Sequence, residues 1–262
     1  MTRVQYRFAM RNSAIAGAFL IATPLLHAAT AYRVTITRND RFKRPPLVAH
    51  GIADGEKRRL TYENQEEPFA EDVFLSTDGG KTETALNTSL HTWFAVNHPP
   101  ATETGLPPMI KAEVSKSSVT VTEEPTNETI AGFPVRKFVI KAGYTTREDY
   151  GGTRVKRVHT MTELIWTTDK LDRSLAFPIP VVTIGMRALD DELRQKTASI
   201  PGFPLRDVKT ISRTYEGGQP LVEMTTTEVD DIRAVPSPPA SQFTKPDGYV
   251  NQEPVIGVPG KS

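Results

Sequence analysis

Few side chains in this sequence could carry chemistry, and their spacing matches no metal or cofactor site. Four histidines follow the N-terminal region: His50, His91, His98 and His159. No two of them have the i, i+4 spacing that places two metal ligands on one face of a helix. Three of the four lie in segments expected to be strands, where a surface or hydrogen-bonded role is more common. We therefore predict that the protein holds no metal and no cofactor.

The remaining motifs also argue against catalysis. Residues 78–82 read Asp-Gly-Gly-Lys-Thr, like the end of a phosphate-binding loop, but Leu75 occupies the position of that loop's first glycine and no helical pattern follows. The acidic pairs Asp190-Asp191 and Asp230-Asp231 are adjacent residues, whose side chains point apart in a helix or a strand. No serine stands in Gly-x-Ser-x-Gly, and the chain has no cysteine. We expect a turn, two solvated acidic surfaces and a non-catalytic protein.

Aromatic side chains form the remaining group of functional interest. Most of them are expected to pack in the core. A curved sheet with a single amphipathic helix, however, has a concave apolar face that one helix does not fill, so some of these side chains could line a cavity. The candidate lining residues are Trp93, Phe94, Phe138, Trp166, Met186 and Leu189.

Two long adjacent strands between Ile130 and Trp166 organise the chain, with a turn at Gly151-Gly152. By strict alternation, one face of the second strand carries Val158, Thr160, Thr162, Leu164 and Trp166. The other face carries Arg157, His159, Met161, Glu163 and Ile165. The first set is interpreted as the apolar face, so we expect Trp166 to be buried where that face ends.

Short strands with tight turns every eight to twelve residues precede this pair, and a further hairpin over 203–232 follows it. Only residues 181–196 break the pattern, because Val182, Met186, Leu189 and Leu193 recur at helical spacing there. The fold class is therefore mainly β (α+β). We predict a strongly curved antiparallel sheet, or incomplete β-barrel, with one main helix covering the concave face.

The N-terminus has the layout of a secretory signal peptide. Arg3, Arg7 and Arg11 precede an apolar run over 14–26, and Ala29-Thr30-Ala31 is a small-x-small cleavage site. The alternative is a membrane anchor, but a membrane-spanning helix needs about 20 apolar residues and this run is shorter. We predict a signal peptide over 1–31 cleaved near Ala31, a periplasmic protein, one domain over 32–249 and a disordered tail over 250–262.

Charge bounds the range of partners. The chain has a formal net charge of +1, and removal of the three N-terminal arginines would give −2. The densest basic run, Lys57-Arg58-Arg59, is too short to make a binding stripe for nucleic acid. We therefore expect no nucleic-acid partner, and no integral membrane segment in the mature chain.

Several motifs in order resemble a group of exported bacterial proteins with a lipoprotein-carrier-like (LolA/LolB-like) fold. They are Asp78-Gly79-Gly80-Lys81, Ile130-Ala131-Gly132-Phe133, Leu164-Ile165-Trp166-Thr167-Thr168-Asp169, Pro201-Gly202-Phe203-Pro204-Leu205 and Phe243-Thr244-Lys245-Pro246-Asp247-Gly248-Tyr249. The resemblance spans about residues 32–249. It implies a curved sheet whose concave side is covered by helix, and in the carriers that cavity holds lipoprotein acyl chains.

The function that the resemblance implies is that of a soluble periplasmic binding or carrier-type protein for a lipid or other apolar ligand. The alternative is an envelope protein that binds another protein and has no small-molecule ligand. A hydrolase with an unfamiliar site is the third hypothesis. Fold alone does not separate the three, because one fold serves many functions.

Overall fold

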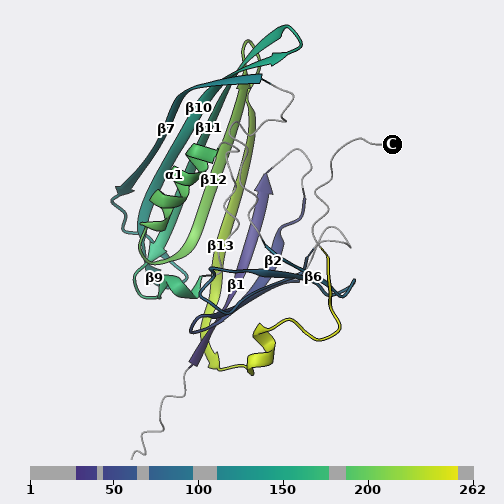
Figure 1. Ribbon diagram of the computed structural model, residues 1–262. Helices are drawn as coiled ribbons and strands as arrows, with labels where there is room; N and C mark the ends of the chain where they lie inside the picture. Colours follow the sequence, from purple (N-terminus) through teal and green to yellow (C-terminus); the bar gives the residue numbers. More distant parts are fainter. Residues whose placement is uncertain (1–27, 40–43, 64–70, 97–110, 177–186, 253–262) are drawn as a thin grey trace, which may run out of the picture.

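One open sheet of twelve strands dominates the protein. In the computed structural model the described residues are 28–39, 44–63, 71–96, 111–176 and 187–252. The strand order is β14-β6-β5-β4-β3-β2-β1-β13-β12-β11-β10-β7, so β14 and β7 are its edges. Neighbouring strands are antiparallel except β14 and β6, which run parallel. The predicted fold class, an open curved sheet with one main helix, is confirmed (Figure 1).

The elements have the following bounds. The first half of the chain contains β1 (Ala28–Asn39), β2 (Leu47–Asp54), β3 (Lys57–Tyr62), β4 (Val73–Ser76), β5 (Thr84–Asn87), β6 (Thr92–Ala95) and β7 (Lys111–Glu124). A small hairpin follows, made of β8 (Thr129–Ile130) and β9 (Phe133–Pro134). The second half contains β10 (Arg136–Tyr150), β11 (Thr153–Thr168), η1 (Arg173–Leu175), α1 (Arg187–Ala198), β12 (Phe203–Tyr215), β13 (Leu221–Pro236), η2 (Ala240–Phe243) and β14 (Val250–Asn251).

Both ends of the described chain take part in the sheet. β1 begins at Ala28, so it includes the predicted cleavage region, and Ala29 is fully buried. At the other end, Val250 and Asn251 of the expected tail pair with β6. Among the described residues, no helix is long and apolar enough to cross a membrane.

The predicted central pair is present as β10 and β11. Their ladder runs without a shift from Arg136 opposite Thr167 to Tyr150 opposite Thr153. The predicted turn at Gly151-Gly152 is confirmed, and both glycines have positive φ, of 66° and 102°. Figure 1 shows these long strands and β12–β13 standing side by side, with β1 next to β13 and the shorter strands β2–β6 beyond it.

The faces of β11 were assigned the wrong way round. Met161 and Ile165, which are 2% and 7% exposed, lie in one cluster with Leu189 and Leu193 of α1. The expected apolar face instead begins with Val158, which is 37% exposed. The face of Met161 and Ile165 also carries charges, and these are buried because they are paired, as described below. We call it the inner face, and the opposite side of the sheet the outer face.

α1 covers part of the inner face. Leu189 and Leu193 are 2% and 0% exposed and lie in one buried cluster with Phe138 and Ile140 of β10 and Val119 of β7, as the helical spacing predicts. The described part of the helix runs from Arg187 to Ala198, and the predicted start at Val181 lies outside the described residues. The predicted contacts of Val182 and Met186 lie outside the described residues.

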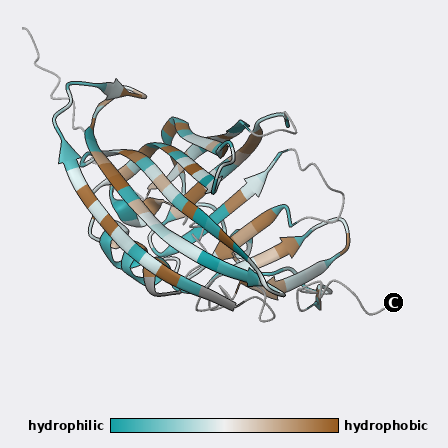
Figure 2. Ribbon diagram, turned by 90° about the horizontal axis from the view of Figure 1, so that it is seen from above, coloured by the Kyte–Doolittle hydropathy of each residue, from teal (hydrophilic) through white to brown (hydrophobic). Residues whose placement is uncertain are grey.

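A second buried cluster lies beside the first, in the part of the sheet around β1–β3. It includes Tyr32, Leu60, Phe203 and Leu205, and the rings of Tyr32 and Phe203 meet edge to face at 5.6 Å between centroids. Residues of the segment around η1, Leu171 and Leu175 among others, pack against it. Hydropathy colouring in Figure 2 shows apolar and polar positions alternating along the strands, as one buried face per strand requires.

The tripeptide Gly-Phe-Pro occurs twice, at 132–134 and 202–204, and the two copies provide a test of local packing. Both glycines have positive φ, 83° at Gly132 and 78° at Gly202. A Cβ at Gly202 would lie 2.7 Å from the backbone oxygen of Thr168, whereas a Cβ at Gly132 would meet nothing within 4 Å. We expect Gly202→Ala to destabilise the fold by about 3 kcal/mol and the matched Gly132→Ala by about 1 kcal/mol. Urea unfolding measures both, and equal losses would contradict the contact at Gly202.

Candidate functional site

The floor beneath α1 is the first part of the candidate site. Phe138 and Ile140 are 5% and 0% exposed, and Met161 and Ile200 join them in the same cluster. Polar contacts that fasten the helix lie at its C-terminal end. Lys196 Nζ donates to the backbone oxygen of Val119, and Arg173 Nη2 donates to that of Thr197 at 3.0 Å. Leu189 and Leu193 make apolar contacts with the floor, which have no directional requirement. α1 also buries Asp190, which is 3% exposed, so the expectation that Asp190 lies on a solvated acidic surface is wrong.

Glu163, Asp207 and Lys209 form a central polar group on the inner face. Glu163 lies opposite Lys209 in the β11–β12 ladder, and Ile165 lies opposite Asp207. Lys209 Nζ is 2.8 Å from Glu163 Oε1, and their side chains are 10% and 6% exposed. A buried ion pair of this kind keeps both groups charged only while both partners are present.

Asp207 holds a proton at neutral pH. The pKa of its carboxyl is raised from 3.8 to about 8, mainly by burial and then by the charge of Glu163 and a hydrogen bond with it, while Lys209 opposes the shift. The Asp207 Oδ1 atom is buried and has no hydrogen-bond partner. With Asp207 neutral, the charges of Glu163 and Lys209 cancel, so the central polar group is uncharged as a whole.

A second polar cluster lies nearer the β10–β11 turn. Glu148 is fully buried, accepts hydrogen bonds from Thr146 Oγ1 at 2.7 Å and from the Tyr150 hydroxyl, and forms an ion pair with Arg157 Nη2 at 3.0 Å. His159 stacks on Tyr144 with ring centroids 4.4 Å apart and planes 4° apart. Burial, and then the charge of Arg157, lowers the pKa of His159. This imidazole is therefore neutral at neutral pH.

The acidic groups on the inner face are already engaged or protonated at neutral pH. Glu148 is held by three partners, Glu163 is held by Lys209, and Asp207 is protonated at neutral pH. General-base catalysis needs a group free to take a proton near the operating pH. On the other half of the sheet, burial raises the pKa of Glu83 to about 7 against the opposing charge of Arg58, so that carboxyl remains a candidate for proton transfer. Among the described residues, no three acidic or histidine side chains gather in a way that would hold a metal ion.

The six aromatic and apolar residues predicted to line a cavity fall in different places. Phe138 and Leu189 meet beneath α1. Trp93 packs against the small cluster of Val73, Leu75 and Leu86, and its neighbour Phe94 is half-buried on the same strand, β6. Met186 lies outside the described residues.

Trp166 is buried, as predicted, but on the outer face, because it follows Ile165 in the strand. It is 7% exposed. Lys137 Nζ and the guanidinium carbon of Arg206 each lie 5.7 Å from its ring centroid, and its Nε1–H donates to Glu128 Oε1 at 3.1 Å. The described contacts therefore do not bring Trp166 together with Phe138 and Leu189.

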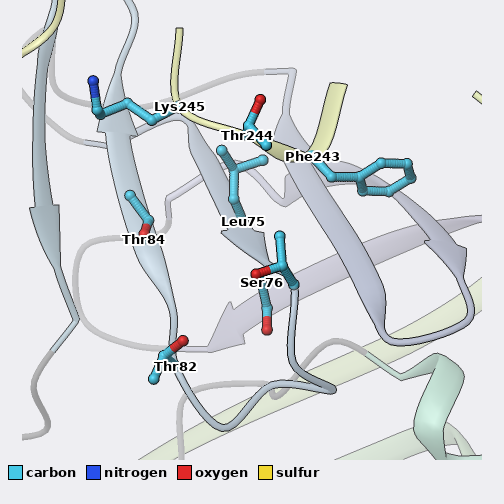
Figure 3. A pocket seen from close by; sticks show the side chains of 8 residues that line it. Leu75, Ser76, Thr82, Thr84, Phe243, Thr244 and Lys245 are labelled. Atoms are coloured by element: carbon cyan, nitrogen blue, oxygen red, sulfur yellow. The ribbon is translucent and has the colours of Figure 1, made fainter. Parts of the chain in front are cut away.

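A small pocket lies on the opposite half of the sheet (Figure 3). It has a volume of about 220 Å³, and its lining is rich in hydroxyls: Leu75, Ser76, Thr77, Thr82, Thr84, Phe243, Thr244 and Lys245. Asp78 closes the adjoining loop by accepting from the backbone N–H groups of Lys81 and Thr82 at 3.0 Å. The hydrogen bonds of Thr82 lower the pKa of Asp78 to about 2. The glycine-rich segment is thus a turn, as expected, and its backbone N–H groups donate to Asp78 within the turn.

Sequence reasoning missed the central polar group. The alternation puts Glu163 on the face opposite the one interpreted as apolar, and Asp207 and Lys209 are ordinary members of an alternating strand. Only the β11–β12 register brings the three together. A partial signal was present. By period-2 alternation, Asp207 and Lys209 share a face with Ile211, and Glu163 shares a face with Ile165. The sequence does not show, however, that these two strands pair or in which register.

Neither protein-family models nor curated proteins match the chain. Among solved structures, it is similar to a domain described as that of an outer-membrane lipoprotein-sorting protein from Vibrio parahaemolyticus. The identity is 10%, the TM-score is 0.32, and the match covers 83% of this chain and 89% of that chain. By its description that domain is of the kind that the sequence motifs resemble. Because the TM-score is this low, the similarity supports no functional argument, and the proposed function rests on this chain's own residues.

Proposed function

We propose that this protein is a non-catalytic binding protein that holds a lipid or other apolar ligand between α1 and the inner face. The observation that carries the proposal is the interface beneath α1. There two leucines, 2% and 0% exposed, cover an apolar floor. Because such contacts are non-directional, an alkyl chain can replace the leucines at little loss of free energy.

The dimensions of the two layers support the same proposal. A helix of 12 residues is about 18 Å long, whereas twelve strands spaced about 4.8 Å apart make a sheet more than 50 Å wide. The described part of α1 is therefore shorter than the sheet is wide. A ligand that entered beside α1 would cover a further part of the inner face.

The neutral central polar group suits an apolar ligand as well. Glu163 and Lys209 cancel each other's charge, and protonated Asp207 adds none. A neutral floor imposes less desolvation penalty on an alkyl chain passing over it than an unpaired charge would. A polar part of the ligand would have Asp207 as a hydrogen-bonding partner.

We also infer that the protein acts in the periplasm after removal of its N-terminal segment. The support is the arginine-led apolar segment before Ala28. Cleavage just before Ala28 would leave β1 whole, whereas cleavage after Ala31 would remove four of its residues.

The proposed function is tested by asking what the protein carries. We expect mass spectrometry of the natively purified protein to detect a bound lipid, and a fluorescent fatty acid to bind and be displaced by it. A protein that yields no bound species and takes up no probe would contradict the proposal. In that event the alternative, a protein-binding module, becomes the better proposal.

A further inference from the structure

Exposed apolar side chains gather at one end of the protein. Among the described residues, eight large hydrophobic side chains are exposed, and six of them lie on two neighbouring hairpins, β10–β11 and β12–β13. They are Tyr150 (42%), Val158 (37%), Tyr215 (45%), Leu221 (48%), Val222 (50%) and Met224 (37%). We call these six residues the hairpin-tip surface. Figure 1 shows both turns at the same end of the long strands, and Figure 2 views the molecule from that end.

The hairpin-tip surface is apolar on both faces of the sheet. Tyr215 lies opposite Arg157, and Leu221 lies opposite Arg213, so both share the inner face. Val158, Val222 and Met224 alternate with those positions and lie on the outer face. A partner protein that packed on one face would leave the other exposed. Insertion of the tips into an apolar medium covers both faces at once.

Two basic side chains next to the β10–β11 turn indicate that this medium has an anionic surface. Arg147 and Lys156 lie directly opposite each other in the β10–β11 ladder, and both are exposed. Like charges in that position destabilise a sheet, and neither side chain has an ion-pair partner among the described residues. An anion between them would remove the repulsion.

Two neighbouring acidic groups are already engaged, and a third, Glu113, lies opposite Arg147 in the β10–β7 ladder and opposes part of its charge. Asp149 accepts from the backbone N–H of Gly152 at 2.8 Å, and Glu223 lies 3.5 Å from Arg213. Arg157 lies 4.4 Å from the ring centroid of Tyr215, and it also holds Glu148. Tyrosines with a polar tip and basic residues with long apolar stems suit the boundary between water and lipid.

We propose that the hairpin-tip surface docks the protein onto an anionic lipid surface. Leu221, Val222 and Met224 enter the boundary between head groups and acyl chains, and Arg147 and Lys156 contact the anionic head groups. The proposal goes beyond ligand binding under α1 and does not depend on it. A protein partner at the same surface is the competing outcome of the test.

A single fluorophore tests the insertion directly, because the chain has no cysteine. An environment-sensitive dye is attached to Val222→Cys and, as a control, to Leu90→Cys, an exposed apolar position away from the tips. Both proteins are used in the same full-length form, so any contribution of residues 1–27 is common to them. We expect the dye at position 222, but not at position 90, to shift to shorter wavelength with vesicles containing phosphatidylglycerol, and less so with phosphatidylcholine alone.

Variants then separate the apolar and the electrostatic contributions. We expect Leu221→Asp with Val222→Asp to weaken vesicle binding at least about 100-fold, whereas Leu90→Asp leaves it unchanged. Arg147→Gln with Lys156→Gln should weaken binding to the anionic vesicles about 30-fold, at about 1 kcal/mol for each basic residue, and high salt should act in the same direction. Fatty-acid probe binding in solution, measured on the same samples, should not change.

Two results would overturn the proposal. One is a dye at position 222 that does not respond to any vesicle. The other is vesicle binding by the Leu221→Asp, Val222→Asp variant that equals that of the wild type. If a photo-crosslinker at position 222 then captures a protein in the membrane fraction and no lipid, the surface is a protein-docking site instead. Loss of probe binding with intact vesicle binding would count against the ligand under α1 alone.

Discussion

Replacing Asp207 by asparagine is expected to stabilise the fold, by an amount that grows as the pH rises. The native carboxyl keeps its proton because it is buried beside the charge of Glu163, and its pKa is raised to about 8. Asparagine has the same shape, remains neutral at every pH and offers an N–H donor in place of the carboxyl proton. The Glu163–Lys209 ion pair is left as it is.

The direction of the effect follows from proton linkage. Between about pH 4 and about pH 8 the folded protein holds a proton on Asp207 that the unfolded chain has released, so the stability of the wild type falls across this interval. The variant has no such proton. One pKa unit corresponds to about 1.4 kcal/mol, and because Asp207 shares its environment with Glu163 we expect a gain of about 3 kcal/mol at about pH 8. Below about pH 4 the two proteins should be equally stable.

Urea unfolding at several pH values measures this gain. Asp247→Asn is the matched control, because Asp247 is exposed and its substitution should leave the pH dependence of stability unchanged. A variant at position 207 that is less stable than the wild type at high pH would show that Asp207 is ionised in the fold. The central polar group would then carry a net negative charge, and the argument for a neutral floor would fail.

The backbone of this fold is largely predictable from local patterns. Alternation over β10 and β11, the Gly151-Gly152 turn and the helical spacing of Leu189 and Leu193 depend on neighbouring residues only. Each of these was expected and is present. The curved sheet follows from them, because many short antiparallel strands with a single helix have few other ways to bury an apolar face.

The choice of the buried face was beyond the reach of such patterns. On β11 the buried side contains His159 and Glu163, and the more exposed side contains Val158 and Leu164. Hydropathy ranks those sides in the opposite order. Charged residues become compatible with burial only through partners such as Lys209 and Arg157, and Lys209 lies more than forty positions from Glu163 in sequence. Trp166 is buried, as predicted. It was also predicted to line a cavity with Phe138 and Leu189, but it lies on the opposite face of the sheet from them.

Replacing Leu189 and Leu193 together by aspartate is expected to detach α1 and abolish ligand retention while the sheet stays folded. Both leucines are buried against β10 and β11 in one cluster, and an aspartate there would have to lose its hydration without a partner, or leave the floor. Each lost leucine removes about 2–4 kcal/mol of packing. The helix keeps its own backbone hydrogen bonds when it leaves, and the strands keep their ladders, so undocking is a local event.

The matched control is Gln195→Asp, which adds a negative charge on the exposed side of the same helix. Hydrogen exchange should show loss of protection in α1 of the double variant, with β10 and β11 remaining protected, and no such loss in the control. The fluorescent fatty acid should bind to the control and to the wild type alike, and not to the double variant. If the double variant retains the probe, the ligand is not held under α1. If β10 and β11 lose protection as well, α1 is an inseparable part of the core, and a ligand that enters by displacing it would have to unfold the sheet.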